Sequence, residues 1–246
     1  MYIIRKPLRA VTLLLAIYFW WLGIGNGLYI GASTGYLENW GGGFRYLTNW
    51  VLTLNLLLAS NAIINEFFKK SPLNLIIPAT LSMNFVVIIL YWGLRILDQS
   101  YLDVNTEEWT LFEWFWDFYL HWGMTILVLI EILFFNRSYI KIISSYLILM
   151  LIFFGYIFWI ELFIMPNNSE PCGKYTCGFP YPFLNEMELS DRNIFYTGVW
   201  IIGTISFVLA RIILIFNKKL IIKYGLSPLD RGTIKIIEDK KIELIE

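Results

Sequence analysis

Between residues 142 and 164 the chain reads IISSYLILMLIFFGYIFWIELFI, in which Glu161 is the one charged residue. A helix needs about 20 consecutive apolar residues to cross a bilayer, so this stretch is long enough. Its apolar residues follow one another without the alternation that a strand of a membrane barrel shows. The stretch therefore predicts a transmembrane α-helix.

Five further stretches of the same character lie on either side of it. They fall at about 10–32, 43–64, 72–94, 114–135 and 194–216, and polar residues, proline or glycine separate them. We expect an all-α membrane protein: a six-transmembrane-helix bundle of residues 1–217, followed by a cytoplasmic tail of residues 218–246. Pro78, inside the third stretch, predicts a kink there, because proline removes a helical hydrogen bond.

The composition of the whole chain also indicates a membrane protein. Of its 246 residues 58% are hydrophobic and 15% are charged, whereas about a quarter of the residues are charged in a typical soluble domain. The 19 basic and 19 acidic residues cancel, so no excess of positive charge indicates a nucleic-acid partner. With two cysteines and one histidine, we expect neither a metal site nor a cofactor.

Basic residues are unevenly shared between the two ends of the predicted spans. The end that carries both termini has Arg5, Lys6, Arg9, Lys69, Lys70, Arg137, Lys141, Lys218, Lys219 and Lys223, and the other end has Arg45, Arg95, Lys174 and Arg192. Because basic loops stay on the cytoplasmic side, both termini are predicted to be cytoplasmic. We expect an integral multi-pass protein of the plasma or endoplasmic reticulum membrane in a eukaryote, or of the inner membrane in a bacterium.

Ionisable residues inside membrane spans are costly and are usually paired or functional. Glu131 and Arg211 both fall in the cytoplasmic third of their spans and are predicted to form a structural ion pair. His121 is the single histidine of the chain, and Asp117 precedes it by one helical turn on the same face. A carboxylate there can hold one imidazole nitrogen and leave the other free to accept a proton.

Thr48 lies at a depth in the membrane similar to that of His121. At a rise of 1.5 Å per residue, Thr48 is about 24 Å from the inner end of its span and His121 about 21 Å. Its hydroxyl is a candidate nucleophile for a base at that depth. Threonine in a membrane helix also commonly bonds back to a carbonyl of its own helix, and the spacing alone favours this second interpretation.

Three segments follow one another along the chain: GFRYLTNWVLTLNLL at residues 43–57, DFYLH at 117–121 and GFPYPFL at 178–184. Together they resemble the androgen-induced 1 and androgen-dependent TFPI-regulating protein family, with its rolling-stone and bacterial relatives. The resemblance implies an intramembrane threonine hydrolase that cleaves fatty acid esters of hydroxy fatty acids or similar lipid esters. It implies Thr48 as the nucleophile and His121 as the base. The partners would be membrane lipids and the lipid-ester substrate.

Further residues have candidate roles in such a hydrolase. Asp117 would orient His121, and the side-chain amides of Asn49 and Asn55 are candidates for stabilising an oxyanion. Candidates for the wall of a lipid pocket are Trp50, Trp116 and Trp122, although tryptophans around the fourth span are more typical of an interfacial belt.

Two alternatives stay open from the sequence. Cys172 and Cys177 lie in a predicted outer loop, where they are either bridged or free. The chain could also be a non-enzymatic multi-pass transporter or interaction protein, for which Thr48 and His121 would be dispensable.

Overall fold

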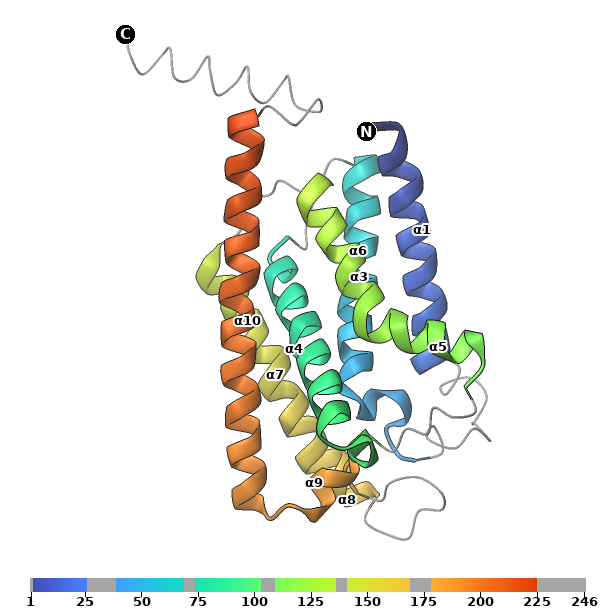
Figure 1. The fold of residues 1–246 in the computed structure, drawn as a ribbon, viewed down its shortest axis with the longest axis vertical. Coiled ribbons are helices and arrows are strands. Elements are labelled where there is room, and N and C mark those ends of the chain that lie inside the picture. Colours follow the sequence, from blue (N-terminus) through green and yellow to red (C-terminus); the bar gives the residue numbers. More distant parts are fainter. Residues whose placement is uncertain are drawn as a thin grey trace.

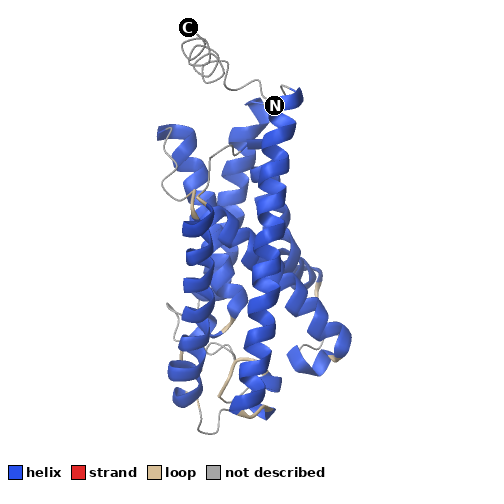
Figure 2. Cartoon of the chain, turned by 90° about the vertical axis from the view of Figure 1, so that its left-hand side faces the viewer, coloured by secondary structure: helices blue, strands red, loops and turns tan. Residues whose placement is uncertain are grey.

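The structure, a computed structural model, describes residues 2–25, 39–68, 74–102, 109–135, 141–168 and 178–224. Within these ranges every regular element is a helix (Figures 1 and 2). Six helices are long and apolar enough to cross a membrane: Ile4–Ile24, Leu47–Phe68, Ile76–Leu97, Leu111–Phe135, Ile142–Asn167 and Leu189–Asn217. The all-helical, six-span architecture is therefore confirmed. Cys172, Cys177 and the chain beyond Tyr224 lie outside the described residues, so the disulfide and the cytoplasmic tail stay predictions.

Several of the spans contain a change of helix type. The first span consists of α1 (Tyr2–Trp20) and a π-helical turn η1 (Trp21–Gly25). The second is α3 (Leu47–Phe68), which follows a 3-10 turn η3 (Gly42–Arg45). The third is α4 (Ile76–Leu97), which a second 3-10 turn η4 (Gln99–Leu102) follows. The fourth joins α5 (Leu111–Phe118), η5 (Tyr119–Gly123), α6 (Met124–Ile130) and η6 (Glu131–Phe135). The fifth joins α7 (Ile142–Trp159), η7 (Ile160–Ile164) and α8 (Met165–Asn167), and a short α9 (Pro182–Glu186) precedes the sixth, α10 (Leu189–Tyr224).

Helix α4 forms the centre of the bundle. It contacts α7 and α10 on one side and α3 and α6 on the other, while α1 packs against α3 (Figure 1). The beginning of α1 and the end of α10 lie at the same end of the bundle (Figure 1). The side of the membrane that this end faces stays a prediction from the basic residues.

Two predicted features near helix ends differ from the structure. The first span begins at Ile4 instead of near residue 10, because Arg5 and Arg9, interpreted above as flanking charges, are paired inside the bundle. Pro78 falls in the first turn of α4, where its missing N–H costs no helical hydrogen bond, so the predicted kink has no cause there. Helix α10 continues past the predicted boundary at residue 217 to Tyr224.

Glu131 forms an ion pair with a residue that was not predicted as its partner. Arg9 donates from Nε to Glu131 Oε2 at 3.1 Å and from Nη1 to Glu66 Oε2 at 2.8 Å. Arg5 donates to the other oxygen of Glu66 at 2.8 Å. Among the described residues Glu131 is therefore paired with Arg9 of α1, while the Glu131–Arg211 pair stays a prediction. Two basic and two acidic side chains thus neutralise one another between α1, α3 and the fourth span.

Replacing Arg9 with methionine should destabilise the bundle by about 3 to 5 kcal/mol, because it leaves the Glu131 carboxylate without its cation in a buried place. Arg9 is 4% exposed. The measurement is the thermal unfolding midpoint of the purified protein in detergent. Arg5→Met is the matched control and should cost less, because Glu66 then keeps Arg9. The double variant Arg9→Met/Glu131→Met should recover part of the loss, and a double variant less stable than Arg9→Met would contradict the pairing.

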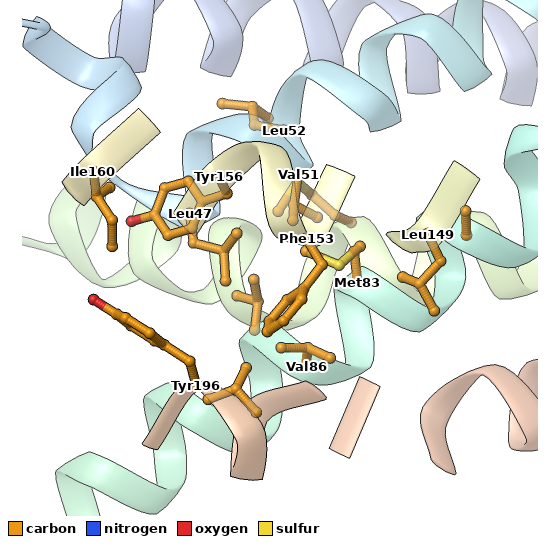
Figure 3. Packing of buried hydrophobic residues seen from close by; sticks show 14 of the residues in the cluster. Leu47, Val51, Leu52, Met83, Val86, Leu149, Phe153, Tyr156, Ile160 and Tyr196 are labelled. Carbon is orange, nitrogen blue, oxygen red and sulfur yellow. The ribbon is translucent and has the colours of Figure 1, made fainter. Parts of the chain in front are cut away.

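A buried hydrophobic cluster joins the start of α3 to the centre of the bundle (Figure 3). Leu47, Val51 and Leu52 of α3 meet side chains of α4, α7, η7 and α10. The labelled partners are Met83, Val86, Leu149, Phe153, Tyr156, Ile160 and Tyr196 (Figure 3). Because the first turn of α3 is packed on several sides, the residue after Leu47 has a well-defined position.

Candidate active site

Close backbone contacts fix the beginning of α3 against the end of the first span. Gly41 has a φ of 90°, a conformation that glycine adopts without strain, and it turns the chain into η3. A Cβ atom on Gly43 would lie 2.0 Å from the carbonyl oxygen of Gly23, so no larger residue fits there. The side-chain amide of Asn49 donates to Gly43 O at 2.8 Å and to Gly23 O at 3.4 Å.

The segment at residues 178–184 closes the same end of α3. The Tyr181 hydroxyl accepts a hydrogen bond from the backbone N–H of Leu47 at 3.2 Å. Burial raises the pKa of Tyr181 to about 12, which keeps this hydroxyl neutral. The Arg45 guanidinium, which is fully buried, donates to Gly178 O at 3.4 Å. The first and third segments of the resemblance therefore meet around the first turn of α3.

Thr48 lies in this turn, and its hydroxyl makes no hydrogen bond to any residue that the structure describes. Its usual acceptors would be the carbonyls four and three residues earlier, those of Phe44 and Arg45. Phe44 O already accepts the indole N–H groups of Trp50 at 2.9 Å and Trp159 at 3.0 Å, which fills both lone pairs. Arg45 O accepts the Tyr156 hydroxyl at 2.8 Å. Back-bonding, which the sequence favoured for Thr48, is therefore absent from its described contacts.

The Thr48 side chain forms part of the wall of a cavity of about 70 Å³. The wall is mostly apolar and combines α3, α4, η4, α7, η7, α9 and α10. Its described residues are Leu47, Thr48, Val87, Leu90, Tyr91, Leu94, Leu102, Phe153, Tyr156, Ile157, Ile160, Tyr181, Phe183, Leu184, Phe195, Tyr196 and Val199. The third segment of the resemblance supplies three of them, Tyr181, Phe183 and Leu184, which gives that segment a structural role.

Five of these residues carry a hydroxyl group, and four of the hydroxyls have a partner. Tyr91 bonds to Asp117, Tyr156 to Arg45 O, Tyr181 to Leu47 N and Tyr196 to Glu161. Thr48 carries the one hydroxyl in this described wall that is without a hydrogen bond. A hydroxyl free in an apolar cavity is available to a bound ligand.

His121 is held by Asp117 through two contacts with the same ring nitrogen. Its Nδ1 lies 2.9 Å from the Asp117 carbonyl oxygen and 3.1 Å from Asp117 Oδ1. Both neighbours are acceptors, so Nδ1 carries the proton of the neutral ring and Nε2 keeps its lone pair. Nε2 has no hydrogen-bond partner among the described residues. The imidazole therefore has the arrangement of a general base, with the acceptor nitrogen left unused.

A π-helical turn places His121 at a bend of the fourth span. η5 covers Tyr119–Gly123, and in Figure 1 α5 runs across the bundle while α6 runs along it. A π turn shifts the backbone pairing from the fourth to the fifth residue, and such turns are frequent at functional sites. The shift frees a carbonyl from its α-helical partner, which is consistent with Asp117 O accepting a side-chain donor here.

Thr48 and His121 are connected through Tyr91, and among the described contacts no hydrogen bond joins them directly. Tyr91 of α4 belongs to the cavity wall with Thr48. Its ring also stacks on the imidazole, with ring centroids 3.4 Å apart and an angle of 9° between the planes. Tyr91 therefore both contacts the imidazole of His121 and lines the cavity that contains Thr48.

The two predicted oxyanion donors have their amide groups occupied elsewhere. Both N–H groups of Asn49 serve Gly43 O and Gly23 O. Those of Asn55 serve Val51 O at 2.7 Å and Asn84 Oδ1 at 2.9 Å, and Asn55 lines a different cavity, between α1, α3 and α6. The backbone N–H of Thr48, in contrast, has no acceptor among the described residues. It replaces Asn49 and Asn55 as the candidate donor.

The predicted tryptophan wall does not coincide with the Thr48 cavity. None of Trp50, Trp116 and Trp122 is among the described residues that line the cavity. Trp50 turns its indole N–H to Phe44 O, Trp116 packs on Phe112, and Trp122 is 40% exposed. Aromatic residues do line the cavity, but they are phenylalanines and tyrosines of α4, α7, α9 and α10 and the segment before α9.

Two residues of the site, Tyr91 and Arg95, were not identified from the sequence. The Tyr91 hydroxyl donates to Asp117 Oδ1 at 2.6 Å and accepts from Arg95 Nη1 at 2.8 Å. Arg95 also lies 3.5 Å from Asp117 Oδ2. The two residues are four positions apart at the end of an apolar span, and this spacing indicates a shared helix face. The signal was missed because Arg95 was assigned to an outer loop. No group of three His, Cys, Asp or Glu side chains converges within the described ranges.

Comparison with known proteins gives one family match. A family model described as FAR-17a/AIG1-like protein matches residues 10–214, which include Thr48, Tyr91, Asp117 and His121. No curated protein and no solved structure matches the chain.

Proposed function

Because this chain belongs to the FAR-17a/AIG1-like family, we propose that it is an intramembrane hydrolase that cleaves lipid esters, with Thr48 as the nucleophile. The substrates are fatty acid esters of hydroxy fatty acids or similar esters, as the resemblance of the three segments implies. The observation that carries the proposal is the Thr48 hydroxyl. It is free of hydrogen bonds in a cavity wall where the four other described hydroxyls are bonded.

The reaction needs a base, and His121 Nε2 takes that role. As Thr48 Oγ1 attacks the ester carbonyl, its proton passes to Nε2, and the carbonyl oxygen becomes an oxyanion. Collapse of this intermediate breaks the bond to the alkoxy oxygen, which takes the proton from His121 and leaves as an alcohol. Water, deprotonated by the same nitrogen, then attacks the acyl-threonine; the bond to Thr48 Oγ1 breaks, Oγ1 takes the proton back from Nε2, and the fatty acid is released. Asp117 keeps the proton of the resting ring on Nδ1 throughout.

The oxyanion requires a donor close to the nucleophile. The free backbone N–H of Thr48 is at the N-terminus of α3, where the helix dipole favours negative charge. In acyl transfer by serine enzymes the backbone N–H of the nucleophile itself is one of the oxyanion donors. The same geometry is available to an acyl-threonine at this position.

The reaction also requires a movement of the side chains. No hydrogen bond joins His121 and Thr48 among the described contacts, so the two side chains must come within hydrogen-bond distance when a substrate is bound. Catalytic hydrogen bonds are often long in an unliganded enzyme and shorten in the complex with substrate.

The test uses the purified full-length protein in lipid nanodiscs. We expect release of free fatty acid from a fatty acid ester of a hydroxy fatty acid, measured by mass spectrometry. We also expect a fluorophosphonate probe to modify the peptide that contains Thr48. Thr53→Ala is the matched control, because Thr53 is on the same helix but bonds back to Asn49 O at 2.9 Å, and it should keep both signals. No release of fatty acid and a probe adduct elsewhere would contradict the proposal and favour a transporter or an interaction protein.

A further inference from the structure

The contacts of Tyr91 are unusual for a residue of a cavity wall. It lines the Thr48 cavity, and its ring stacks on the His121 imidazole. Its hydroxyl lies between Arg95 Nη1 and Asp117 Oδ1 at 2.8 and 2.6 Å. One side chain therefore touches both the imidazole and the carboxylate that holds it.

We propose that Tyr91 is the positioning residue of His121: its ring fixes the plane of the imidazole, and its hydroxyl fixes the carboxylate of Asp117. This rests on the proposed function, because it assigns to Tyr91 a role in the reaction of Thr48 and His121. Tyr91 does not exchange a proton with the substrate. Its effect reaches the reaction through the orientation of Nε2.

The stacked Tyr91 ring restricts a rotation of the imidazole that the contacts with Asp117 alone would allow. The two contacts with Asp117 both involve Nδ1, so they leave the ring free to rotate about an axis through that nitrogen. A parallel ring at a centroid distance of 3.4 Å removes this freedom, because rotation would drive the imidazole into the tyrosine. The direction of Nε2 is thereby set by a residue of a different span.

The hydroxyl contact restricts the carboxylate in the same way. Asp117 Oδ1 accepts from Tyr91 and from His121, while Oδ2 faces Arg95. With both oxygens engaged, the carboxylate cannot turn away from Nδ1. Arg95 is itself held over the rings of Trp92, Trp109 and Trp114 at 5.2 to 5.8 Å from their centroids, so the chain of contacts ends in a fixed cation.

Two variants of Tyr91 separate the two contacts. Tyr91→Phe keeps the ring and removes the hydroxyl, and we expect about tenfold lower kcat with unchanged KM, because the cavity wall is preserved. Tyr91→Leu removes the ring as well, and we expect about 100-fold lower kcat, the order of loss that a small misplacement of a catalytic group causes. Tyr146→Phe is the matched control, because its hydroxyl bonds to Thr204 of α10 and should be neutral for kcat.

A second measurement does not depend on catalysis. His121 is the only histidine, so protein labelled with ¹⁵N-histidine gives the signals of this one imidazole. At a pH where the ring is neutral, the wild type, Tyr91→Phe and Tyr146→Phe should show one tautomer with the proton on Nδ1. Tyr91→Leu should show shifted ring-nitrogen signals that average over more than one orientation.

The outcomes separate this inference from the proposed function. If the wild type does not hydrolyse esters but Tyr91→Leu shifts the imidazole signals, then the positioning contact stands and the proposed reaction fails. If esters are hydrolysed and Tyr91→Leu leaves both kcat and the imidazole signals unchanged, then the positioning role is overturned. A lower thermal midpoint in Tyr91→Leu with unchanged signals and unchanged kcat per folded molecule would likewise reduce Tyr91 to a packing residue.

Discussion

Replacing Thr48 with alanine should lower kcat/KM for lipid-ester hydrolysis by about 1,000-fold or more, because it removes the atom that forms the acyl intermediate. The fold should tolerate this change. The Thr48 hydroxyl makes no hydrogen bond to a described residue and the side chain is half-buried, so we expect the unfolding free energy to change by less than about 1 kcal/mol. Steady-state kinetics in nanodiscs and thermal unfolding of the same preparation are the two measurements.

The serine variant makes this prediction specific to the hydroxyl. Thr48→Ser keeps the nucleophilic oxygen and should retain activity within about tenfold of the wild type, whereas Thr48→Val keeps the shape and should be as inactive as alanine. Thr53→Ala again controls for the loss of a threonine from α3. Undiminished turnover in Thr48→Ala would exclude Thr48 as the nucleophile, whatever the serine variant does.

Replacing His121 with alanine should lower kcat by about 100- to 10,000-fold, the contribution that general acid–base catalysis usually makes. The expectation depends on Nε2, which has no partner among the described residues while Nδ1 is held by Asp117. Because the deletion also leaves a space beside Tyr91, imidazole added to the solution can enter and replace the missing base. Partial recovery of kcat with increasing imidazole is the expected result.

The rescue distinguishes a lost base from a disturbed fold. The wild type and Thr48→Ala should not respond to imidazole, because the first has its own base and the second lacks a nucleophile. Normal turnover by His121→Ala without imidazole would rule out the proposed base. An equal response to imidazole in Thr48→Ala would mean that imidazole itself hydrolyses the substrate.

The spans were predictable because each depends on local composition. Some of their ends were not, because the charges near them are compensated by distant residues. Arg9 is buried in the bundle because it pairs with Glu66 and Glu131, which lie 57 and 122 residues away in sequence. The same distance explains why Arg9 was not predicted as a partner of Glu131: depth in the membrane is readable from the sequence, but the choice of partner is a matter of packing.

The features of the candidate site also differ in whether they depend on local sequence or on long-range packing. The contact of Asp117 with His121 follows from helical spacing and was expected. The free hydroxyl of Thr48 depends on Trp159, whose indole fills the second lone pair of Phe44 O from 115 residues away. No local sequence pattern indicates this hydrogen bond, and the spacing alone predicts back-bonding, which is usual for a threonine in a membrane helix. The amides of Asn49 and Asn55 likewise serve to join helices, which their position on the same helix as Thr48 does not reveal.

The π-helical turns have a genetic consequence. His121, Glu131 and Glu161 lie in η5, η6 and η7, and each such turn holds one residue more than the α-helical turn it replaces. Deleting a single codon from a regular α-helix rotates all that follows by about 100° around its axis, whereas deleting one from a π turn removes the extra residue and leaves the following residues facing the same neighbours. The coding sequence of these spans should therefore tolerate the loss of one triplet at a π turn better than elsewhere in the helix, and gaps between relatives can fall within spans as well as between them.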